Sequence, residues 1–245
     1  MNRHTLEFKK NFMKKIIFLV AISLTSIFTY AQMTTETRQT GNFTGLDVSS
    51  AIEVEYTQSP NTSVKIEAEA SVMSKIITEV KSGVLHLYTQ EIRNLKTDIK
   101  IYVTGPTLTF LDVSGAAEFK AKDKINISSL KLSVSGAGYV KMPVEGGDID
   151  ADISGAGDAA LKGNIAKLKA EVSGASNLRA AALKCDKVNI EVSGAADATI
   201  NVTSELKADV SGASSLRYVG APAMKDCESS GASSIKKYTK DEDDN

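Results

Sequence analysis

The sequence predicts an all-β fold: a right-handed parallel β-helix, also called a β-solenoid, with rungs of about 19 residues. Three observations predict it. The motif Ser-Gly-Ala recurs seven times, the apolar residues around each copy are spaced by two, and no helical period competes after residue 105. With 245 residues, 42% of them hydrophobic, the chain is long enough to bury a substantial core.

Residues 1–31 are predicted to be a signal peptide that is removed from the mature protein. The apolar run Ile16–Phe28 follows a basic segment and precedes small residues that allow cleavage before Gln32. The run is shorter than the roughly 20 apolar residues that cross a membrane, so we favour cleavage over a retained anchor helix. Met13 is a second candidate start, which would leave residues 1–12 upstream.

The mature chain is predicted to be weakly acidic and exported. Removal of residues 1–31 leaves 24 basic and 29 acidic residues, a net charge of −5. This balance gives no reason to expect nucleic acid as a partner. We expect no integral membrane span after cleavage, and a location in the periplasm, at the outer-membrane surface or outside the cell.

Residues 33–110 are predicted to be β-rich but irregular. Three segments alternate between apolar and polar residues, and each predicts a strand with one buried face: Ile52–Tyr56, Val64–Ala68 and Ile99–Val103. Val72–Val80 predicts a short helix, and Asp47–Ala51 is a degenerate copy of the repeat motif. We expect this part to lead into the same solenoid.

The regular rungs are predicted over residues 106–239. Successive motif copies are 18 to 21 residues apart, and their first serines are Ser114, Ser135, Ser154, Ser173, Ser193, Ser211 and Ser230. Positions one, three and five before that serine, and five after it, are mainly apolar. Because so short a period leaves no room for a crossover helix, each copy is one rung, and equal positions stack at roughly 4.8 Å.

The Ser-Gly-Ala triplet is predicted to turn a corner of each rung. Glycine can adopt the positive φ angle that a sharp bend needs, and alanine permits a tight stack. The serine hydroxyl is expected to bond to the backbone or to its neighbour in the next rung. The corner glycines are Gly115, Gly136, Gly155, Gly174, Gly194, Gly212 and Gly231.

The C-terminal end is predicted to be a polar cap over residues 222–239. Lys225, Ser229 and Lys237 stand there in columns that are otherwise mostly apolar. A solenoid needs such a cap to cover its open end. Residues 240–245 are mainly acidic and are expected to be a solvated tail.

Two columns of charge are predicted to form exposed ladders on different faces. The position two before the serine is acidic in six of seven copies, and these residues are the acid ladder: Asp112, Asp152, Glu171, Glu191, Asp209 and Glu228. The position six after the serine is basic in five of seven copies, and these residues are the base ladder: Lys120, Lys141, Arg179, Arg217 and Lys236. The ladders either keep the strands soluble or form a ligand surface, the acids for cations or cationic partners and the bases for acidic glycans.

The sequence predicts no catalytic, cofactor-binding or metal-binding residues. The motifs His-Glu-x-x-His and Gly-x-Ser-x-Gly are absent, and His86, the one histidine after residue 31, is expected at the surface. A calcium site among Asp148, Asp150 and Asp158 has weak support, because nine-residue calcium repeats do not fit this period. We therefore expect neither an enzyme nor a cofactor.

Cys185 and Cys227 are predicted to be unpaired. Their repeat positions place them two rungs apart, roughly 10 Å by strand spacing. That separation exceeds the Cα distance of about 7 Å that a disulfide tolerates. Both are expected to be buried as small hydrophobic side chains.

Several motifs resemble those of the head GIN domain family. They are Arg38 with Phe43 and Leu46, then Ile52-x-Val54-x-Tyr56, then Gly83-Val84-Leu85-x-Leu87, and Pro106-x-Leu108 before the Ser-Gly-Ala repeats. The resemblance covers roughly residues 36–236. Members are exported bacterial proteins described as auto-transporter adhesins, so the resemblance implies a parallel β-helix without catalytic residues. It also implies one domain of this type, which we place at residues 32–239.

These expectations together predict a non-enzymatic, adhesin-like protein that binds an envelope or surface ligand, either a glycan or a protein. One alternative is a structural or signalling accessory of the periplasm. Another is a polysaccharide-acting enzyme, whose acidic residues would be Asp148, Asp150 and Asp152 near Gly146. The irregular N-terminal part or the open solenoid ends could also mediate oligomerisation.

Overall fold

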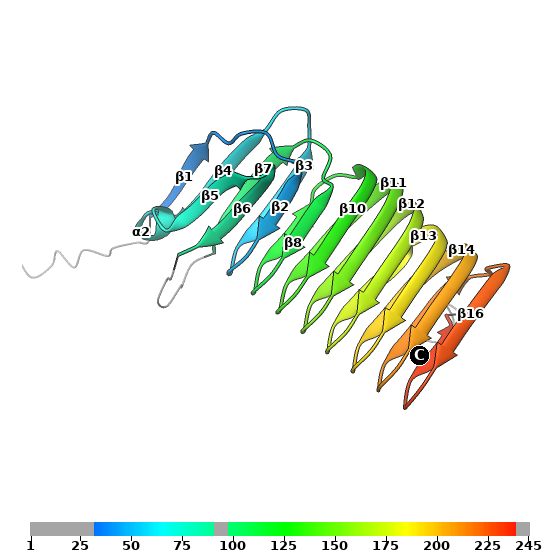
Figure 1. Ribbon diagram of the computed structural model, residues 1–245. Helices are drawn as coiled ribbons and strands as arrows, with labels where there is room; N and C mark the ends of the chain where they lie inside the picture. Colours follow the sequence, from blue (N-terminus) through cyan, green and yellow to red (C-terminus); the bar gives the residue numbers. More distant parts are fainter. Residues whose placement is uncertain (1–31, 91–97, 239–245) are drawn as a thin grey trace, which may run out of the picture. The chain divides into compact units, whose positions relative to one another are not determined.

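A computed structural model describes residues 32–90 and 98–238 of the chain. From Met33 onward the chain forms one compact unit. β-Strands make up most of it and form a 17-stranded sheet that coils into stacked rungs (Figure 1). The predicted parallel β-solenoid is confirmed. The predicted signal peptide and the acidic tail lie outside the described residues.

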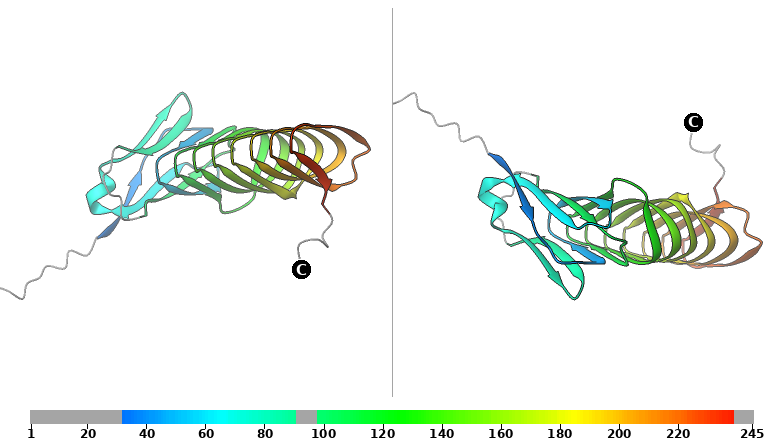
Figure 2. Two further views of the ribbon diagram at one scale, coloured as in Figure 1. Left: turned by 90° about the horizontal axis from the view of Figure 1, so that it is seen from below. Right: turned by 90° about the horizontal axis from the view of Figure 1, so that it is seen from above.

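Each regular rung has two sides. Face A is formed by the segment before the Ser-Gly-Ala corner, and face B by the segment after it. Four long strands run from face B across a bend into face A: β11 (Tyr139–Ile153), β12 (Asp158–Val172), β13 (Asn177–Val192) and β14 (Asp197–Val210). Figure 2 shows these rungs following one another in chain order.

Face A continues through shorter strands at both ends. Before the long strands come β5 (Ile76–Lys81), β6 (Val84–Thr89), β2 (Gly45–Val48), β8 (Phe110–Val113) and β10 (Ile125–Val134), and after them comes β16 (Met224–Ser229). Equal repeat positions are partners across the parallel strands, as with Val48, Val113, Val134 and Ile153. The apolar columns therefore stack inside the coil.

Face B has the same plan. Before the long strands come β1 (Met33–Arg38), β4 (Ser63–Glu69), β7 (Lys100–Gly105), β3 (Glu53–Gln58) and β9 (Glu118–Ala121), and after them come β15 (Ser215–Gly220) and β17 (Ser234–Lys237). The antiparallel pairs β1–β4, β4–β7 and β5–β6 lie at the N-terminal end. The three strands predicted in this part correspond to β3, β4 and β7.

The N-terminal rungs are not stacked in sequence order. On face A, β2 lies between β6 and β8, and on face B, β3 lies between β7 and β9. The degenerate motif Asp47–Ala51 forms the corner of the β2–β3 rung, since Ser114 N donates to Val48 O and Ala116 N to Ser50 O, both at 2.9 Å. Ser50 takes the place of the corner glycine, with φ 74°.

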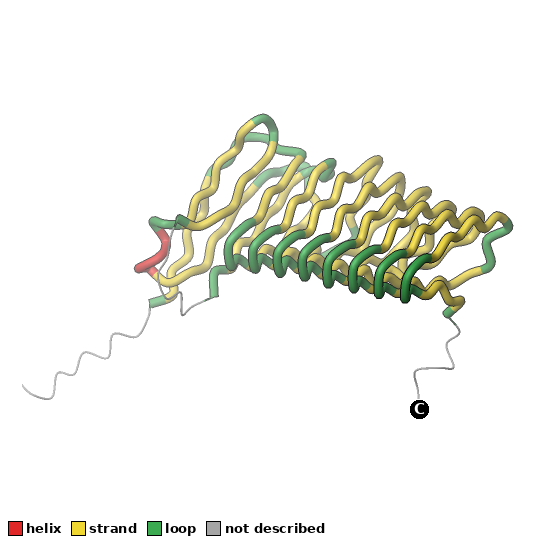
Figure 3. Tube along the Cα trace, turned by 60° about the horizontal axis from the view of Figure 1, so that its bottom comes forward, coloured by secondary structure: helices red, strands yellow, loops and turns green. Residues whose placement is uncertain are grey.

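The corners form a continuous stack along one edge of the coil (Figure 3). All seven predicted corner glycines have positive φ angles, between 65° and 79°. Each rung donates to the one before it, as when Ala175 N donates to Gly155 O at 2.7 Å. A Cβ atom on Gly174 would lie 2.6 Å from that same oxygen, so the close approach of the rungs requires glycine there as well.

The corner hydroxyl bonds come from a different serine than predicted. Ser176 donates to Ser173 O (2.7 Å) within its own corner and to Ile153 O (3.1 Å) in the preceding rung. Ser214 and Ser233, at the same repeat position, make the equivalent bonds. Ser176 and Ser214 are buried, so their hydroxyls need a protein partner. The first serine of the motif, in contrast, is exposed enough to reach water.

The helix predicted over Val72–Val80 is wrong in extent. Helix α2 spans only Ala70–Met73, and the residues from Ile76 onward form β5 against β6. β-Branched side chains in this segment favour the strand. Arg38 holds the junction, because its guanidinium donates to the carbonyl of Ile76, to Met73 O (3.1 Å) and to Thr78 Oγ1 (3.3 Å).

The last described rung has the polar character that the sequence predicts. Lys225 and Ser229 are partners of Leu206 and Val210 of the inward columns, yet both are exposed. The Lys225 ammonium lies 5.6 Å from the centre of the Tyr218 ring and so covers one of the last aromatic side chains of the interior.

Candidate functional site

The acid ladder is a continuous row on face A. In the strand register its members are consecutive partners, with one serine among them: Asp112, Ser133, Asp152, Glu171, Glu191, Asp209 and Glu228. Asp47 and His86 extend the row at its N-terminal end. Sequence reasoning missed these two because their strands lie outside the regular repeat, although the motif at Asp47 was a signal for the first.

The N-terminal end of the acid ladder is partly buried. Desolvation, reinforced by the neighbouring Asp47 carboxylate, raises the pKa of Asp112. Asp47 itself has a partner, since His86 Nδ1 donates to its Oδ2 at 2.8 Å. His86 points away from the apolar side as expected, but it is a half-buried partner of this row rather than a free surface residue.

The base ladder is a continuous row on face B. Its members are consecutive partners interrupted by two short side chains: Lys120, Lys141, Ala160, Arg179, Thr199, Arg217 and Lys236. Each gap, at Ala160 or Thr199, leaves two longer basic side chains two rungs apart. The strand register thus places both predicted ladders on opposite faces of one coil.

The bases differ in their partners. Lys120 lies 2.8 Å from Glu118 and 3.3 Å from Glu53, and the hydrogen bond to Glu118 leads the causes that raise the pKa of Lys120. Arg179 Nη2 lies 3.1 Å from Asp158 Oδ1. The contact lacks hydrogen-bond geometry, so this buried oxygen has an ion-pair partner but no hydrogen-bond donor.

The remaining bases of the ladder are open. Lys141, Arg217 and Lys236 form no ion pair with any acidic side chain in the part of the chain that the structure describes. All three are exposed. The C-terminal half of face B therefore presents bases without an ion-pair partner, although the exposed Asp197 stands in the row beside them.

Face A carries a third charged row that the sequence analysis did not identify. It stands four positions before the repeat serine and contains Lys131, Asp150, Lys169, Asn189, Lys207 and Asp226 as consecutive partners. Lys169 lies 3.2 Å from Glu171 and 3.7 Å from Asp150. Lys169 therefore offsets part of the charge of the acid ladder beside it. The alternation of basic with acidic or amide residues in this column was the signal that could have revealed the row.

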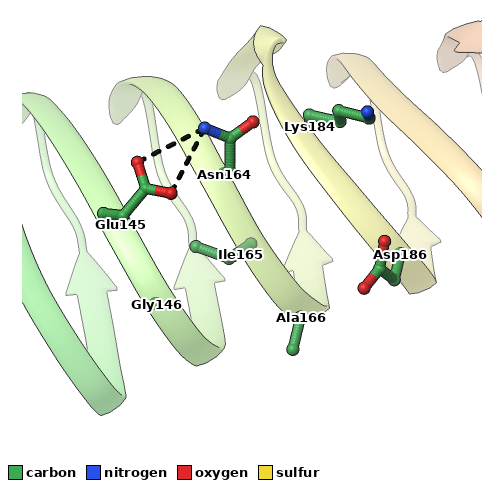
Figure 4. Close-up of a pocket in the computed structure, with 7 residues that line it drawn as sticks. All are labelled: Glu145, Gly146, Asn164, Ile165, Ala166, Lys184 and Asp186. Carbon is green, nitrogen blue, oxygen red and sulfur yellow. Dashed lines mark hydrogen bonds between the residues drawn. The ribbon is translucent and has the colours of Figure 1, made fainter.

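A polar hollow of about 300 Å³ lies at the bend between the two faces (Figure 4). Glu145 and Asn164 lie on adjacent rungs and point toward each other, with Asn164 Nδ2 3.3 Å from both carboxylate oxygens. Lys124 also donates to Glu145 at 3.0 Å. Because these contacts already engage the carboxylate, the hollow is a contact between rungs rather than an open charged site.

A second hollow, of about 280 Å³, opens within the base ladder itself. Its lining comes from three successive strands of face B: Asn177, Leu178 and Arg179 of β13, Asp197, Ala198 and Thr199 of β14, and Ser215 and Arg217 of β15. Leu178 and Ala198 are buried, so the other six side chains provide its polar wall.

The two thiols are free, and they differ in burial. Cys185 is buried, and desolvation raises its pKa to about 12, so it is unreactive as a nucleophile. Cys227 is only half-buried, contrary to the prediction, because it lies in the last described rung. Cys185 is a partner of Ile165 and Cys227 a partner of Ala208, so they occupy different columns.

The weakly supported calcium site is not assembled. Asp148 and Asp150 lie on the face A half of β11, whereas Asp158 lies at the start of β12 on face B. Within the described ranges, no group of three or more His, Cys, Asp or Glu side chains could hold a metal ion. In those same ranges no helix is long and apolar enough to cross a membrane.

These features define a class, the parallel β-solenoid with charged rows on its exposed faces. The chain belongs to the family described as "Putative auto-transporter adhesin, head GIN domain", whose model matches residues 42–222. That description indicates an exported protein and names an adhesin rather than an enzyme. No curated protein matches the chain.

Solved structures show the same fold. A "putative adhesin" of Bacteroides fragilis is 25% identical, covers 85% of this chain and 98% of its own, and has a TM-score of 0.81. A "putative adhesin" of Parabacteroides merdae is 18% identical over 85% of this chain and 97% of its own, with a TM-score of 0.68. A "putative lipid binding protein" of Parabacteroides distasonis is 16% identical over the same shares, with a TM-score of 0.62.

Proposed function

We propose that this protein is a non-enzymatic, exported binding protein of the adhesin type, whose base ladder binds an acidic ligand at the cell envelope or surface. In this proposal residues 1–31 direct export, and residues 32–239 are a single binding domain. The observation that carries it is the register of face B, which aligns five bases in one row and leaves Lys141, Arg217 and Lys236 without acidic partners among the described residues.

The geometry of the row suits a ligand with repeated negative charge. Strand pairing fixes the spacing between rungs at roughly 4.8 Å, so the backbone holds the bases in order before a ligand binds, and only their side chains remain to be ordered. Exposed charges of one sign raise the local concentration of an oppositely charged ligand. An acidic glycan or the acidic surface of a protein meets this description.

We rank the acid ladder second, because three lysines stand in the row beside it and Lys169 contacts one of its members, Glu171. Lys169 contacts Glu171 and Asp150, and Lys131 and Lys207 stand in the same adjacent row. A cationic partner would have to compete with them. The acid ladder remains the second proposed surface, for a cation or a cationic partner.

The proposal can be tested by neutralising the base ladder. In the quadruple variant Lys120→Gln, Lys141→Gln, Arg179→Gln and Arg217→Gln, attachment of producing cells to an acidic glycan surface should be lost while the folded state is retained. The matched control removes four lysines from face A, at Lys131, Lys167, Lys169 and Lys207, and should attach like the wild type. Unchanged attachment of the base-ladder variant would reject the proposal.

Location is tested separately by protease treatment of intact producing cells, with a periplasmic protein as control. Loss of the chain while the control survives would support surface exposure. Equal protection would favour the alternative, a structural or signalling accessory of the periplasm. Depolymerisation of an acidic polysaccharide by the purified protein would instead support the enzyme alternative, with Asp148, Asp150 and Asp152 as the acidic residues to replace.

A further inference from the structure

The hollow within the base ladder has a more specific construction than the rest of that row. Arg179, Thr199 and Arg217 are consecutive partners, so the two arginines stand two rungs apart, roughly 9.6 Å between Cα atoms. The short Thr199 side chain leaves the space between them open, and that space is the hollow of about 280 Å³.

Both arginines can offer directed hydrogen bonds to an oxyanion. A guanidinium has five N–H donors in a planar fork that matches a carboxylate. The contact of Arg179 with Asp158 involves Nη2, which steadies the side chain while other donors stay available. Arg217 has no acidic partner in the described part of the chain. The hydroxyl of Thr199 lies between the two.

The row beside these residues is polar and not simply basic. Asn177, Asp197 and Ser215 are consecutive partners, and each stands two residues before Arg179, Thr199 or Arg217 on the same strand. Asp197 is exposed at the hollow. A carboxylate beside two arginines weakens the attraction of the hollow for a bare polyanion, but it accepts hydrogen bonds from the hydroxyls of a sugar.

We propose that this hollow binds one acidic sugar unit, with the sugar carboxylate between Arg179 and Arg217 and the ring hydroxyls on Asp197, Asn177 and Ser215. The inference deepens the proposed function and rests on it, because it names the chemical class that the base ladder takes. The volume of about 280 Å³ lies just below the range of drug-sized ligand sites, about 300 to 1,000 Å³, and so suits a single sugar rather than a large ligand.

Titration of the full-length protein with three acidic oligosaccharides tests the site. The probes are tri-galacturonate, a hyaluronan tetrasaccharide and sialyllactose, each beside a neutral oligosaccharide of equal length. Removing a charged hydrogen-bond donor in Arg217→Gln should weaken binding of at least one acidic probe about tenfold. Lys207→Gln removes the same charge from face A, outside the hollow and outside the base ladder, and should change the dissociation constant by less than about twofold.

Asp197→Asn separates recognition of a sugar from simple charge attraction. If Asp197 accepts hydrogen bonds from sugar hydroxyls, its replacement should weaken binding although the net charge of the hollow becomes more positive. If attraction of charge alone operates, the same replacement should strengthen binding. Both variants change exposed side chains, and a circular dichroism spectrum and thermal midpoint equal to those of the wild type would show that the fold is retained.

The outcomes also distinguish this inference from the proposed function. Equal loss in Arg217→Gln and Lys207→Gln, tighter binding by Asp197→Asn, or no binding of any acidic probe would overturn the sugar site. Cell attachment that still depends on the base ladder would leave the proposed function standing in each case. Conversely, titration could show probe binding that depends on Arg217 and Asp197 while the attachment of producing cells does not require the base ladder. That combination would retain the site and reject the adhesin role.

Discussion

The N-terminal rungs and the regular rungs are held together by different means. Before residue 120 the interior contains Phe43, Tyr56 and Phe119, and the Tyr56 hydroxyl donates to the carbonyl of Pro106. Side-chain bonds from Arg38 and antiparallel strands complete that end. The later rungs rely on small apolar columns and on a repeated backbone ladder with glycine at every corner.

One inward column illustrates how the side chains of the N-terminal and regular rungs differ in size. Val54, Phe119, Val140, Ala159, Leu178, Ala198 and Leu216 are consecutive partners, and all are buried. The column therefore accepts a large ring at Phe119, near its N-terminal end, but alternates small and large residues after Val140. We infer that backbone spacing limits the regular rungs, whereas side-chain volume limits the first ones. Four substitutions test this contrast.

The largest effect is expected from Gly163→Ala in β12. Gly163 has φ 122°, and an added Cβ would overlap the carbonyl oxygen of Val144 in the adjacent rung. The combined strain and overlap should lower the free energy of unfolding by about 4 kcal/mol or more. Urea unfolding measures it. Gly41→Ala is the control, since a Cβ there meets nothing within 4 Å, and it should change stability by less than about 0.5 kcal/mol.

Phe119→Ala should have the next largest effect. The ring is fully buried and lies 5.9 Å from the ring of Tyr56, centre to centre. Its removal leaves a cavity and should cost about 3–4 kcal/mol in the same unfolding measurement. Ala198→Gly in the same column removes only a methyl group, and should cost about 1 kcal/mol or less. Similar losses at both sites would contradict the contrast between the two regions.

Arg38→Ala should weaken the N-terminal end alone. Loss of its bonds to the carbonyls of Met73 and Ile76 leaves both with fewer partners, at a cost of about 2 kcal/mol. Hydrogen exchange should accelerate over Ile76–Lys81 while β12 and β13 keep their protection. Lys81→Ala, which breaks an exposed ion pair with Glu79, is the control with little expected effect. Faster exchange across all rungs would show that the two regions unfold together.

The smallest effect is expected from Asp112→Asn, where the two regions meet. Burial and the Asp47 carboxylate raise the pKa of Asp112 in the folded state, so the ionised form destabilises the protein at neutral pH. The substitution should stabilise it by a few tenths of a kcal/mol at pH 7. Protonation of Asp112 removes its charge in the wild type as pH falls through the raised pKa. The stability advantage of the variant should therefore vanish at pH 3. An advantage that grows on acidification would contradict this account.

Most of the regular solenoid was predictable because its sequence repeat is short and because apolar and polar residues alternate strictly along each strand. The columns found by aligning the serines, including both charged ladders, became rows in the strand register. Val72–Val80 was mistaken for a helix because a short apolar run does not distinguish a helix from a strand until its pairing partner is known. The corner serine was misassigned because burial, not motif position, decides which hydroxyl needs a protein partner.

The solenoid, its rung length, its glycine corners and the rows of charge all follow from the amino-acid sequence, since each of these repeats within about 19 residues. Tertiary structure alone decided the order of the first rungs, with β2 and β3 lying between strands that follow them in the chain. It also decided which bases are neutralised and that Arg179, Thr199 and Arg217 enclose a hollow. These features depend on contacts between rungs far apart in sequence, and on side-chain directions that no local period specifies.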